Sequence, residues 1–336
     1  MRAEGSAHPP IRHLLLTGGT GFFGTALLRE WVAGNLPALT GARLTLVTRD
    51  PARARAVMGR LLEAVGARVV AGDPLRPETL PEGEYTHILH AATDSTRGPA
   101  LKPLSRFDQI VHGTRHILDL AVRCGRPRVL LTSSGAVYGP QPQEMPTIPE
   151  DYLGMPDPLD PHQAYGVGKR MAEQLAAIYG FEHGLETVIA RAFAFVGPDL
   201  PGDVHFAIGN FIHDAVASRE IVVRGDGTPL RTYLDQRDLA QWMVTLLVAG
   251  APQRAYNVGS DEVISIAEVA GLVAKVEGRR TTVRILGEGV ISAKTHRQRY
   301  VPDITRAQSE MWLRVRYDLA TALAHSIEVL RGKQYR

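Results

Sequence analysis

The chain has 336 residues with 44% hydrophobic and 22% charged side chains, the composition of an ordinary globular protein with one large or two smaller domains. Its formal net charge is only +3, and no dense run of Lys and Arg interleaved with aromatic residues occurs, so we expect no nucleic-acid partner. The single cysteine, Cys124, excludes an internal disulfide, and the sequence shows neither an apolar export signal nor a membrane-length apolar run. We therefore expect a cytoplasmic protein that does not bind membranes.

Apolar strands alternate with helical stretches through the first half of the chain. The strands are apolar on both faces, and such alternation is typical of a parallel sheet with helices on either side. We therefore expect an α/β fold with a doubly wound parallel sheet. In chain order, the predicted elements are strands at 11–19, 42–48, 67–73, 87–93 and 128–134, and helices at about 25–34, from 51, and at about 105–123.

The second half of the chain is less regular. Residues 140–161 are rich in proline and are predicted to form a surface loop, which leads to a helix at about 162–179 and a strand at 185–193. Beyond residue 193 we expect a smaller lobe with short strands at 221–227 and 231–234 and a helix from Asp238. The segment "AYNVGS" at 255–260 is predicted to return to the main sheet as one more strand.

The segment "LLLTGGTGFFG" places Gly18, Gly21 and Gly24 between the first predicted strand and the first predicted helix. The first two glycines allow a tight turn close to a pyrophosphate, and the third allows the helix to pack on the sheet. With Phe22 and Phe23, this loop is expected to contact a dinucleotide. The pattern predicts a Rossmann-type dinucleotide-binding domain at 11–192, to which 235–260 return, and a smaller C-terminal substrate-binding lobe formed by 193–234 and 261–336.

Two strand ends bear on the choice between NAD and NADP. An acidic residue after the second strand would bind the adenosine ribose and repel a 2′-phosphate, whereas an arginine can hold that phosphate. The sequence has Thr48 and Arg49 there, which favours NADP, although a solvated Arg49, or one lying over the adenine, leaves the choice open. Asp73, after the third strand, is expected to accept the adenine amino group.

Tyr165 and Lys169 stand four residues apart at the start of a predicted helix, so their side chains are adjacent on one face. A lysine ammonium and an oxidised nicotinamide both favour the phenolate of a tyrosine, which can take a hydroxyl proton while hydride leaves the same carbon. Ser134, at the end of the strand at 128–134, is predicted to hold the substrate oxygen. Ser134, Tyr165 and Lys169 are the predicted catalytic residues, and the last two are also expected to contact the cofactor.

In this order the motifs resemble those of the extended short-chain dehydrogenase/reductases, in particular the nucleotide-sugar epimerase/dehydratase branch. The segments "TGGTGFFG", "HAAT", "SSGAVYG" and "YGVGK" are similar to the cofactor loop, the fourth-strand turn, the serine strand end and the YxxxK motif of that family. The resemblance implies that Ala91, Ala92 and Thr93 contact the cofactor, with Thr93 also near the substrate. It implies that Arg231 and Arg299 bind a nucleoside-diphosphate sugar, and that the protein is a homodimer.

Three departures from the pattern of this branch narrow the reaction. Its hexose 4,6-dehydratases and sugar-acid decarboxylases follow the serine or threonine with a pair that supplies a carboxylate, whereas this sequence has Gly135 and Ala136. Eliminating water needs an additional acid and base, so the pair disfavours dehydration. Ile110 replaces an asparagine that helps a proton relay, and Ala194 replaces an asparagine that many members present to the substrate phosphates.

The resemblance and the departures favour an NAD(P)-dependent nucleotide-sugar epimerase that acts by transient hydride transfer, with C4 as the expected carbon. The alternative is an NADPH-dependent reductase of a 4-keto nucleotide sugar, which Thr48 and Arg49 favour. A dehydratase or decarboxylase is a weaker alternative, and so is a non-catalytic NAD(P) sensor, which has no need of a complete catalytic set. No metal is expected, because His112 and His116, one helical turn apart, fall on the polar face of their predicted helix.

Overall fold

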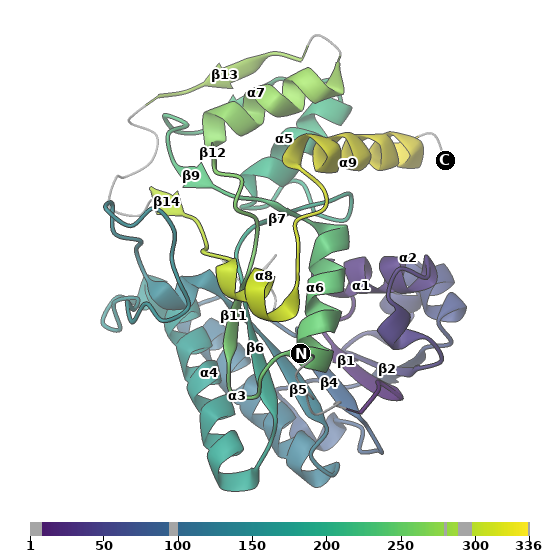
Figure 1. The fold of residues 1–336 in the computed structure, drawn as a ribbon. Helices are drawn as coiled ribbons and strands as arrows, with labels where there is room; N and C mark the ends of the chain where they lie inside the picture. Colours follow the sequence, from purple (N-terminus) through teal and green to yellow (C-terminus); the bar gives the residue numbers. More distant parts are fainter. Residues whose placement is uncertain (1–8, 94–99, 279–280, 288–297, 335–336) are drawn as a thin grey trace, which may run out of the picture.

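The centre of the fold is a seven-stranded sheet in which every neighbouring pair of strands is parallel (Figure 1). The computed structural model describes residues 9–93, 100–278, 281–287 and 298–334. The strand order β11-β6-β5-β4-β1-β2-β3 confirms the predicted doubly wound α/β sheet of Rossmann type, including the return of the predicted strand at 255–260. The strands are β1 (His13–Thr17), β2 (Arg43–Thr48), β3 (Arg68–Ala71), β4 (His87–His90), β5 (Arg128–Ser134), β6 (Thr187–Ala192) and β11 (Ala255–Val258).

Apolar strand residues build one core on each face of the sheet. Successive side chains of a strand point to opposite faces, and in β1 Leu14 and Leu16 enter one core while Leu15 enters the other. All three leucines are fully buried, as expected of a sheet covered on both faces. The covering helices are α1 (Phe22–Val32), α2 (Pro51–Ala64) and α6 (Gln236–Ala249) on one face, and α3 (Pro103–Arg123) and α4 (Ala164–His183) on the other.

A smaller lobe stands over the carboxyl ends of the sheet strands (Figure 1). Its core joins side chains of three helices, among them Phe211, Val269 and Leu323. The other strands and α-helices of the described residues are β7 (Phe195–Val196), α5 (Ala207–Val216), β8 (Ile221–Val223), β9 (Leu230–Arg231), β10 (Leu234–Asp235), β12 (Ile264–Ser265), α7 (Ile266–Glu277), β13 (Val283–Ile285), β14 (Arg299–Tyr300), α8 (Thr305–Met311) and α9 (Leu319–Gln334).

One segment of the block 261–336, which the sequence assigns to the lobe, packs on the sheet domain. Ile304, Ala307 and Leu313, in and around α8, belong to the core that α6 shares with the sheet. The Trp242 indole N–H of α6 also donates to the Arg314 carbonyl oxygen at 3.2 Å. The chain therefore returns from the lobe to the sheet once more, because the apolar side of α8 covers the edge strand β11.

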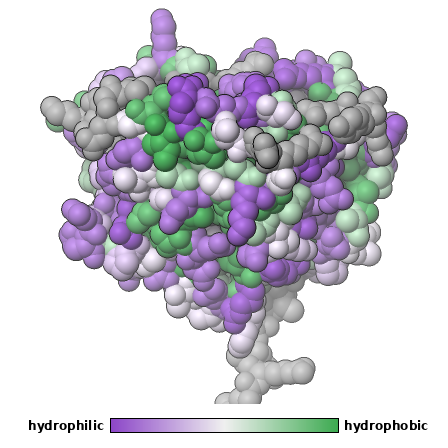
Figure 2. All heavy atoms as spheres, turned by 90° about the horizontal axis from the view of Figure 1, so that it is seen from above, coloured by the Kyte–Doolittle hydropathy of each residue, from purple (hydrophilic) through white to green (hydrophobic). Residues whose placement is uncertain are grey.

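The surface seen from above the lobe intersperses hydrophilic and hydrophobic residues (Figure 2). Within the described part of the chain, no helix combines the length and the apolar character that crossing a membrane requires. The first eight residues, on which the expectation about an export signal depends, lie outside the described residues.

Candidate active site

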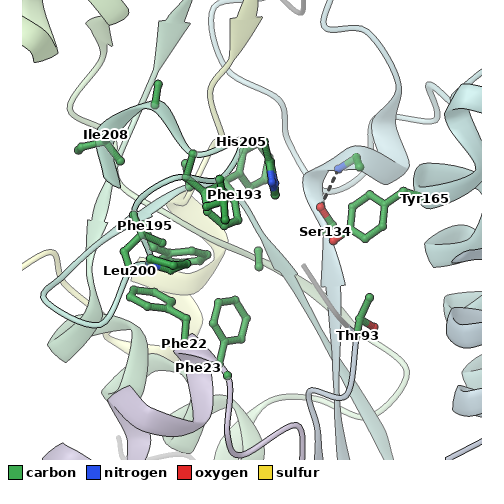
Figure 3. A pocket seen from close by; sticks show the side chains of 18 of the residues that line it. Phe22, Phe23, Thr93, Ser134, Tyr165, Phe193, Phe195, Leu200, His205 and Ile208 are labelled. Atoms are coloured by element: carbon green, nitrogen blue, oxygen red, sulfur yellow. Dashed lines mark hydrogen bonds between the residues drawn. The ribbon is translucent and has the colours of Figure 1, made fainter. Parts of the chain in front are cut away.

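A cleft of about 1740 Å³ runs along the carboxyl ends of the sheet strands, beneath the lobe. Ligand clefts of roughly 300 to 1,000 Å³ hold one drug-sized molecule, so this cleft has room for two ligands side by side. It lies at the crevice that forms where the strand order reverses, here between β1 and β4. In Figure 3, Ser134 and Tyr165 lie on one side of the cleft, opposite Phe193 and His205.

The glycine loop forms a cradle at the start of α1. Gly18 has a φ of +73°, and a Cβ atom there would lie 2.2 Å from the Ala91 carbonyl oxygen, so only glycine fits. Gly21 is the N-cap of α1, whose first turn has neither a side-chain cap nor an acidic residue, so its N–H groups suit a diphosphate. Because Gly21 caps it, α1 begins at Phe22 rather than near residue 25.

Gly24 has a packing role and does not line the cleft. A Cβ atom on it would lie 2.2 Å from the Gly19 Cα, so α1 could not approach the loop as closely with any other residue. Five further residues that sequence analysis selected for the cofactor do line the cleft: Phe22, Phe23, Ala91, Ala92 and Thr93.

The ends of β2 and β3 form the part of the cleft expected to hold the adenosine. Thr48 and Arg49 line it, and Arg53 from the first turn of α2 adds a second guanidinium that sequence analysis missed. The Asp50 carboxylate is engaged as the N-cap of α2, where it accepts the Arg53 N–H at 2.9 Å. Asp73 lines the same end, and its side chain accepts the backbone N–H two residues further on at 3.0 Å.

Lys169 is held between the ends of β4 and β5. Its Nζ donates to the Thr93 hydroxyl at 2.9 Å and to the Thr132 carbonyl oxygen at 2.7 Å, and the residue is only 3% exposed. Burial lowers the pKa of Lys169 to about 7; the negative Glu173 opposes this shift and the positive Arg106 adds to it. A protonated amine has three donors, so the two fixed bonds leave one for a ligand in the cleft.

Ser134 ends β5 and is positioned by the turn that follows it. Its Oγ accepts the Ala136 backbone N–H at 3.2 Å, which leaves the serine proton to be donated elsewhere. The Tyr300 hydroxyl of β14 lies 3.4 Å from the same oxygen. The three predicted catalytic residues, Ser134, Tyr165 and Lys169, all line this cleft. Sequence analysis did not select Tyr300, because nothing local to it indicates that β14 returns to this point.

Tyr165 lies in the first turn of α4, against α3. Ile110 of α3 is buried in the small apolar cluster on which Tyr165 packs, so residue 110 supplies no polar group for a proton relay. One helical turn earlier, Arg106 places its guanidinium carbon 4.4 Å from the centre of the Tyr165 ring. Sequence analysis missed this arginine, since the pairing of α3 with α4 brings it to the site.

The position after Ser134 has no room for a side chain. A Cβ atom on Gly135 would lie 2.7 Å from the Phe193 Cζ and 2.7 Å from the Tyr300 hydroxyl oxygen. The Phe193 and Tyr300 rings pack with their centres 4.5 Å apart and close this space together. The carboxylate that dehydration would need is therefore missing from the sequence, and side chains from elsewhere fill the space beside Gly135.

The lobe carries the residues expected to bind the substrate. Arg231 of β9 lines the cleft, and Ala194 lines it without offering an amide. Arg299 does not line the cleft; its guanidinium lies 3.4 Å from the Pro146 carbonyl oxygen, whereas its neighbour Tyr300 does line it. The charged or titratable lobe residues that line the cleft and were not selected from the sequence include His205, Arg219 and Arg224.

A buried polar network supports the end of β5 from the side of α4. Ser133 donates to Glu173 at 2.5 Å, and Arg191 of β6 binds the same carboxylate at 2.7 Å. Arg191 also donates to the Tyr138 hydroxyl at 2.8 Å, and that hydroxyl donates to Asn257 of β11 at 2.8 Å. Since the charges of this network are paired, it holds three strands together beside the site.

The two histidines of α3 have other partners. The His116 Nδ1 lies 2.7 Å from the Pro74 carbonyl oxygen, and the His112 Nδ1 lies 4.0 Å from the Asp108 carboxylate. Across residues 9–93, 100–278, 281–287 and 298–334, no group of three or more His, Cys, Asp or Glu side chains is arranged to hold a metal ion.

The sequence matches those of known proteins along most of its length. Residues 14–259 match the family model described as "NAD dependent epimerase/dehydratase family". The chain is 30% identical over 330 residues to a dTDP-glucose 4,6-dehydratase of Streptomyces griseus, with 94% of this chain and 93% of that protein covered. It is 27% identical over 309 residues to UDP-glucuronic acid decarboxylase 1 of Xenopus tropicalis, with 90% of this chain and 70% of that protein covered.

Solved structures share the fold. The dTDP-glucose 4,6-dehydratase DesIV of Streptomyces venezuelae, with NAD and TYD bound, has a TM-score of 0.82 and 24% identity, with 96% of this chain and 98% of that chain covered. The UDP-glucose 4-epimerase of Thermotoga maritima, with UDP-glucose, has a TM-score of 0.80 and 19% identity, with 96% and 99% covered. The same fold thus occurs in enzymes with different reactions, so the residues of the site must decide between them.

Proposed function

Because this chain belongs to the NAD-dependent epimerase/dehydratase family, we propose that it is an NAD(P)-dependent nucleotide-sugar epimerase that inverts one sugar carbon, C4 being the expected one. The observation that carries the proposal is the closed space beside Gly135, where Phe193 and Tyr300 leave no room for a carboxylate. Reversible oxidation of one carbon needs a set such as Ser134, Tyr165 and Lys169, whereas eliminating water needs a further acid and base.

The residues at the ends of β1 to β4 fit a dinucleotide. The conformation of Gly18 and the uncapped first turn of α1 suit a pyrophosphate, and the remaining donor of Lys169 suits the hydroxyls of the nicotinamide ribose. A nicotinamide bound there would supply reversible hydride transfer at the sugar carbon.

The protein side chains handle the proton of the same reaction. Tyr165, as a phenolate, takes the proton of the sugar hydroxyl while the hydrogen on the same carbon leaves with its electron pair, so that a ketone forms. Ser134 donates to the reacting oxygen and stabilises the charge that develops on it. In the return step Tyr165 gives the proton back to that oxygen. Between the two steps the ketone reorients in the cleft and presents its other face. The hydrogen therefore returns to that face, and the sugar carbon is inverted without net oxidation.

The lobe side of the cleft supports a nucleoside-diphosphate sugar as the substrate. Arg231, Arg219 and Arg224 line it, and guanidinium groups bind phosphate oxygens through paired, charge-assisted hydrogen bonds. The names of the relatives specify dTDP-glucose and UDP-glucuronic acid, two sugars of this class. Arg299, which the resemblance selects for the nucleotide half, would have to leave the Pro146 carbonyl to reach such a ligand.

A second candidate function is an NADPH-dependent reductase of a 4-keto nucleotide sugar. The observation that favours it is the pair Arg49 and Arg53 at the expected adenosine end, where Thr48 replaces an acidic residue and Asp50 is engaged as a helix cap. Two guanidinium groups suit the 2′-phosphate of NADP. In that case the proton and hydride transfers at the sugar carbon would occur only once per substrate, and they would reduce the ketone to an alcohol.

We also propose a homodimer that pairs through the outer faces of α3 and α4. Met171 and Ile178 are large apolar residues of α4 that are 41% and 38% exposed, and Leu104 of α3 is 72% exposed. Apolar residues on the outer faces of neighbouring helices suit helix pairing between subunits. Light scattering should give the mass of a dimer, and Met171→Lys combined with Ile178→Lys should give a monomer.

The retained nucleotide and the products separate the candidate functions. Denaturing the purified protein releases any bound cofactor for identification, and a panel of UDP-, dTDP-, CDP- and GDP-sugars is then incubated with the protein. An epimerase retains its cofactor and forms a product of unchanged mass without consuming NAD(P)H. Consumption of NADPH with a 4-keto sugar would identify the reductase instead. A product lighter by one water would overturn the argument from Gly135, and Tyr165→Phe should abolish either turnover.

A further inference from the structure

Arg106 is a cation of the cleft that the reaction described above does not use. It lies one helical turn before Ile110 on the face of α3 that packs against α4, and its guanidinium carbon stands 4.4 Å above the centre of the Tyr165 ring. The residue is partly exposed and lines the cleft, but its Nε is buried and has no hydrogen-bond partner in the described residues.

Leaving one guanidinium nitrogen of Arg106 buried without a hydrogen bond opposes folding. No ion pair involving Arg106 occurs among the described residues. By contrast, the more deeply buried Arg191 meets the Glu173 carboxylate. A guanidinium without such a partner is suited to a site where a negative charge forms during the reaction, and the adjacent group that becomes negative is the Tyr165 phenol.

Lys169 alone is an uncertain source of positive charge for that phenol. Its amine is fixed by Thr93 and Thr132, and burial lowers its pKa to about 7, so near neutral pH a large fraction of it is uncharged. Burial also lowers the pKa of Arg106, and the Tyr165 charge opposes that shift, but a guanidinium is so strong a base that it stays protonated.

Among the described residues, several other titratable or polar groups lie near Tyr165, including His162 in the turn before α4, which also lines the cleft. On α4 the titratable neighbours are Lys169 and the negative Glu173, and from the strands come the uncharged hydroxyls of Ser134 and Tyr300. From the lobe, His205 lines the cleft, and burial together with Arg106 lowers its pKa, which disfavours its charged form.

We propose that Arg106 is a positioning residue for Tyr165: stacked on the ring, its guanidinium holds the phenol in place and stabilises the phenolate. Arg106 acts from the face of α3 that packs on α4, where Ile110 supplies no polar group for a proton relay. The inference rests on the proposed function in one respect, namely that Tyr165 is the base. It predicts that the protein keeps an active Tyr165 at pH values where Lys169 has lost most of its charge.

The test compares Arg106→Met with Arg106→Lys and with Lys102→Met, an exposed residue just before α3 whose replacement removes the same charge away from the ring. For Arg106→Met we expect the pH profile of kcat/KM to move to higher pH by about one pH unit, with roughly a tenfold loss near pH 7. Arg106→Lys should recover most of the profile, and Lys102→Met should leave it unchanged. KM should change little, because the arginine acts through Tyr165.

A second measurement does not depend on turnover. The ultraviolet absorbance of tyrosinate is followed against pH in the wild type and in Tyr165→Phe, and the difference isolates Tyr165; the same difference is measured in the Arg106→Lys and Arg106→Met backgrounds. The midpoint should rise in the Met background and less in the Lys background. An unmoved midpoint together with an activity loss that is uniform across pH would overturn the proposal. If no nucleotide sugar is turned over, the proposed function fails, whereas the titration still tests Arg106.

Discussion

Replacing Gly135 tests whether the site is closed to a carboxylate. The Cβ of Gly135→Ala would lie 2.7 Å from the Phe193 Cζ and 2.7 Å from the Tyr300 hydroxyl oxygen, and 2.9 Å from the Phe193 Cε1. Carbon atoms in contact prefer about 3.5 to 4.0 Å, so both rings must retreat by about 1 Å. Phe193 is buried and packs on Tyr138 as well, so this retreat disturbs a filled core. We expect a loss of about 1 to 3 kcal/mol in the free energy of unfolding.

Urea denaturation, monitored through tryptophan fluorescence, measures this loss in the free energy of unfolding. Tyr300→Phe removes one of the three close atoms, so Gly135→Ala should cost less in that background, and a double-mutant cycle should show coupling of at least about 0.5 kcal/mol. Gly135→Asp adds a carboxylate to the same crowded space and should destabilise the protein further without creating a dehydrated product. If Gly135→Ala is as stable as the wild type and additive with Tyr300→Phe, the space is open and the argument against dehydration fails.

The remaining predictions concern two buried bases and the cofactor. Lys169→Met should abolish turnover yet stabilise the free protein at and below pH 7 by at most about 5 kcal/mol, because a buried amine with its pKa lowered to about 7 opposes folding where it is charged. The unfolded chain binds that proton up to about pH 10.5, so wild-type stability in urea should rise from pH 7 to 10.5 and the variant should lack this rise. Burial lowers the pKa of His90 to about 3, so the wild type should lose stability as the pH falls from 6.5 toward 3, and His90→Gln should lose less over that range. Arg49→Ala should raise the Kd of NADPH about tenfold in a fluorescence titration and change that of NADH less than twofold, and equal changes for both would show that Arg49 does not bind the 2′-phosphate.

The parts of the site that lie within one strand and its following turn could be predicted from the sequence. Gly18 and Gly21 follow a strand of the parallel sheet and Ser134 ends another, and the carboxyl ends of such strands meet at one edge. Tyr165 and Lys169 belong to one helix, where a spacing of four residues fixes their proximity. Each prediction needed only local geometry and the order of the strands.

The parts that depend on distant segments could not be predicted. Arg106 reaches Tyr165 because α3 packs on α4, and Tyr300 reaches Ser134 because β14 pairs with β9 above the sheet. Arg299 illustrates the difficulty, since it is one residue from Tyr300 in the same strand. Neighbouring side chains of a strand point to opposite faces, so only one of the pair can face the cleft, and the structure places Tyr300 there. The sequence resemblance correctly points to the segment that contains β14. Which residue of that segment faces the cleft depends on how β14 pairs with its neighbouring strand.

Ser133 and Ser134 look alike in the sequence, and the geometry of β5 separates their roles. Ser133 meets Glu173 on α4, while Ser134 lies beside Tyr300 at the cleft. Glu173 is also the negative charge that raises the pKa of Lys169 against the effect of burial, so the network behind Ser133 sets how far that lysine is protonated. Tyr165 therefore has two neighbouring cations of different kinds: Lys169, whose charge varies with pH and with Glu173, and Arg106, whose charge does not. On the proposal that Tyr165 is the base, a titrating and a permanent cation together keep its phenolate over a wider pH range than the lysine alone would allow.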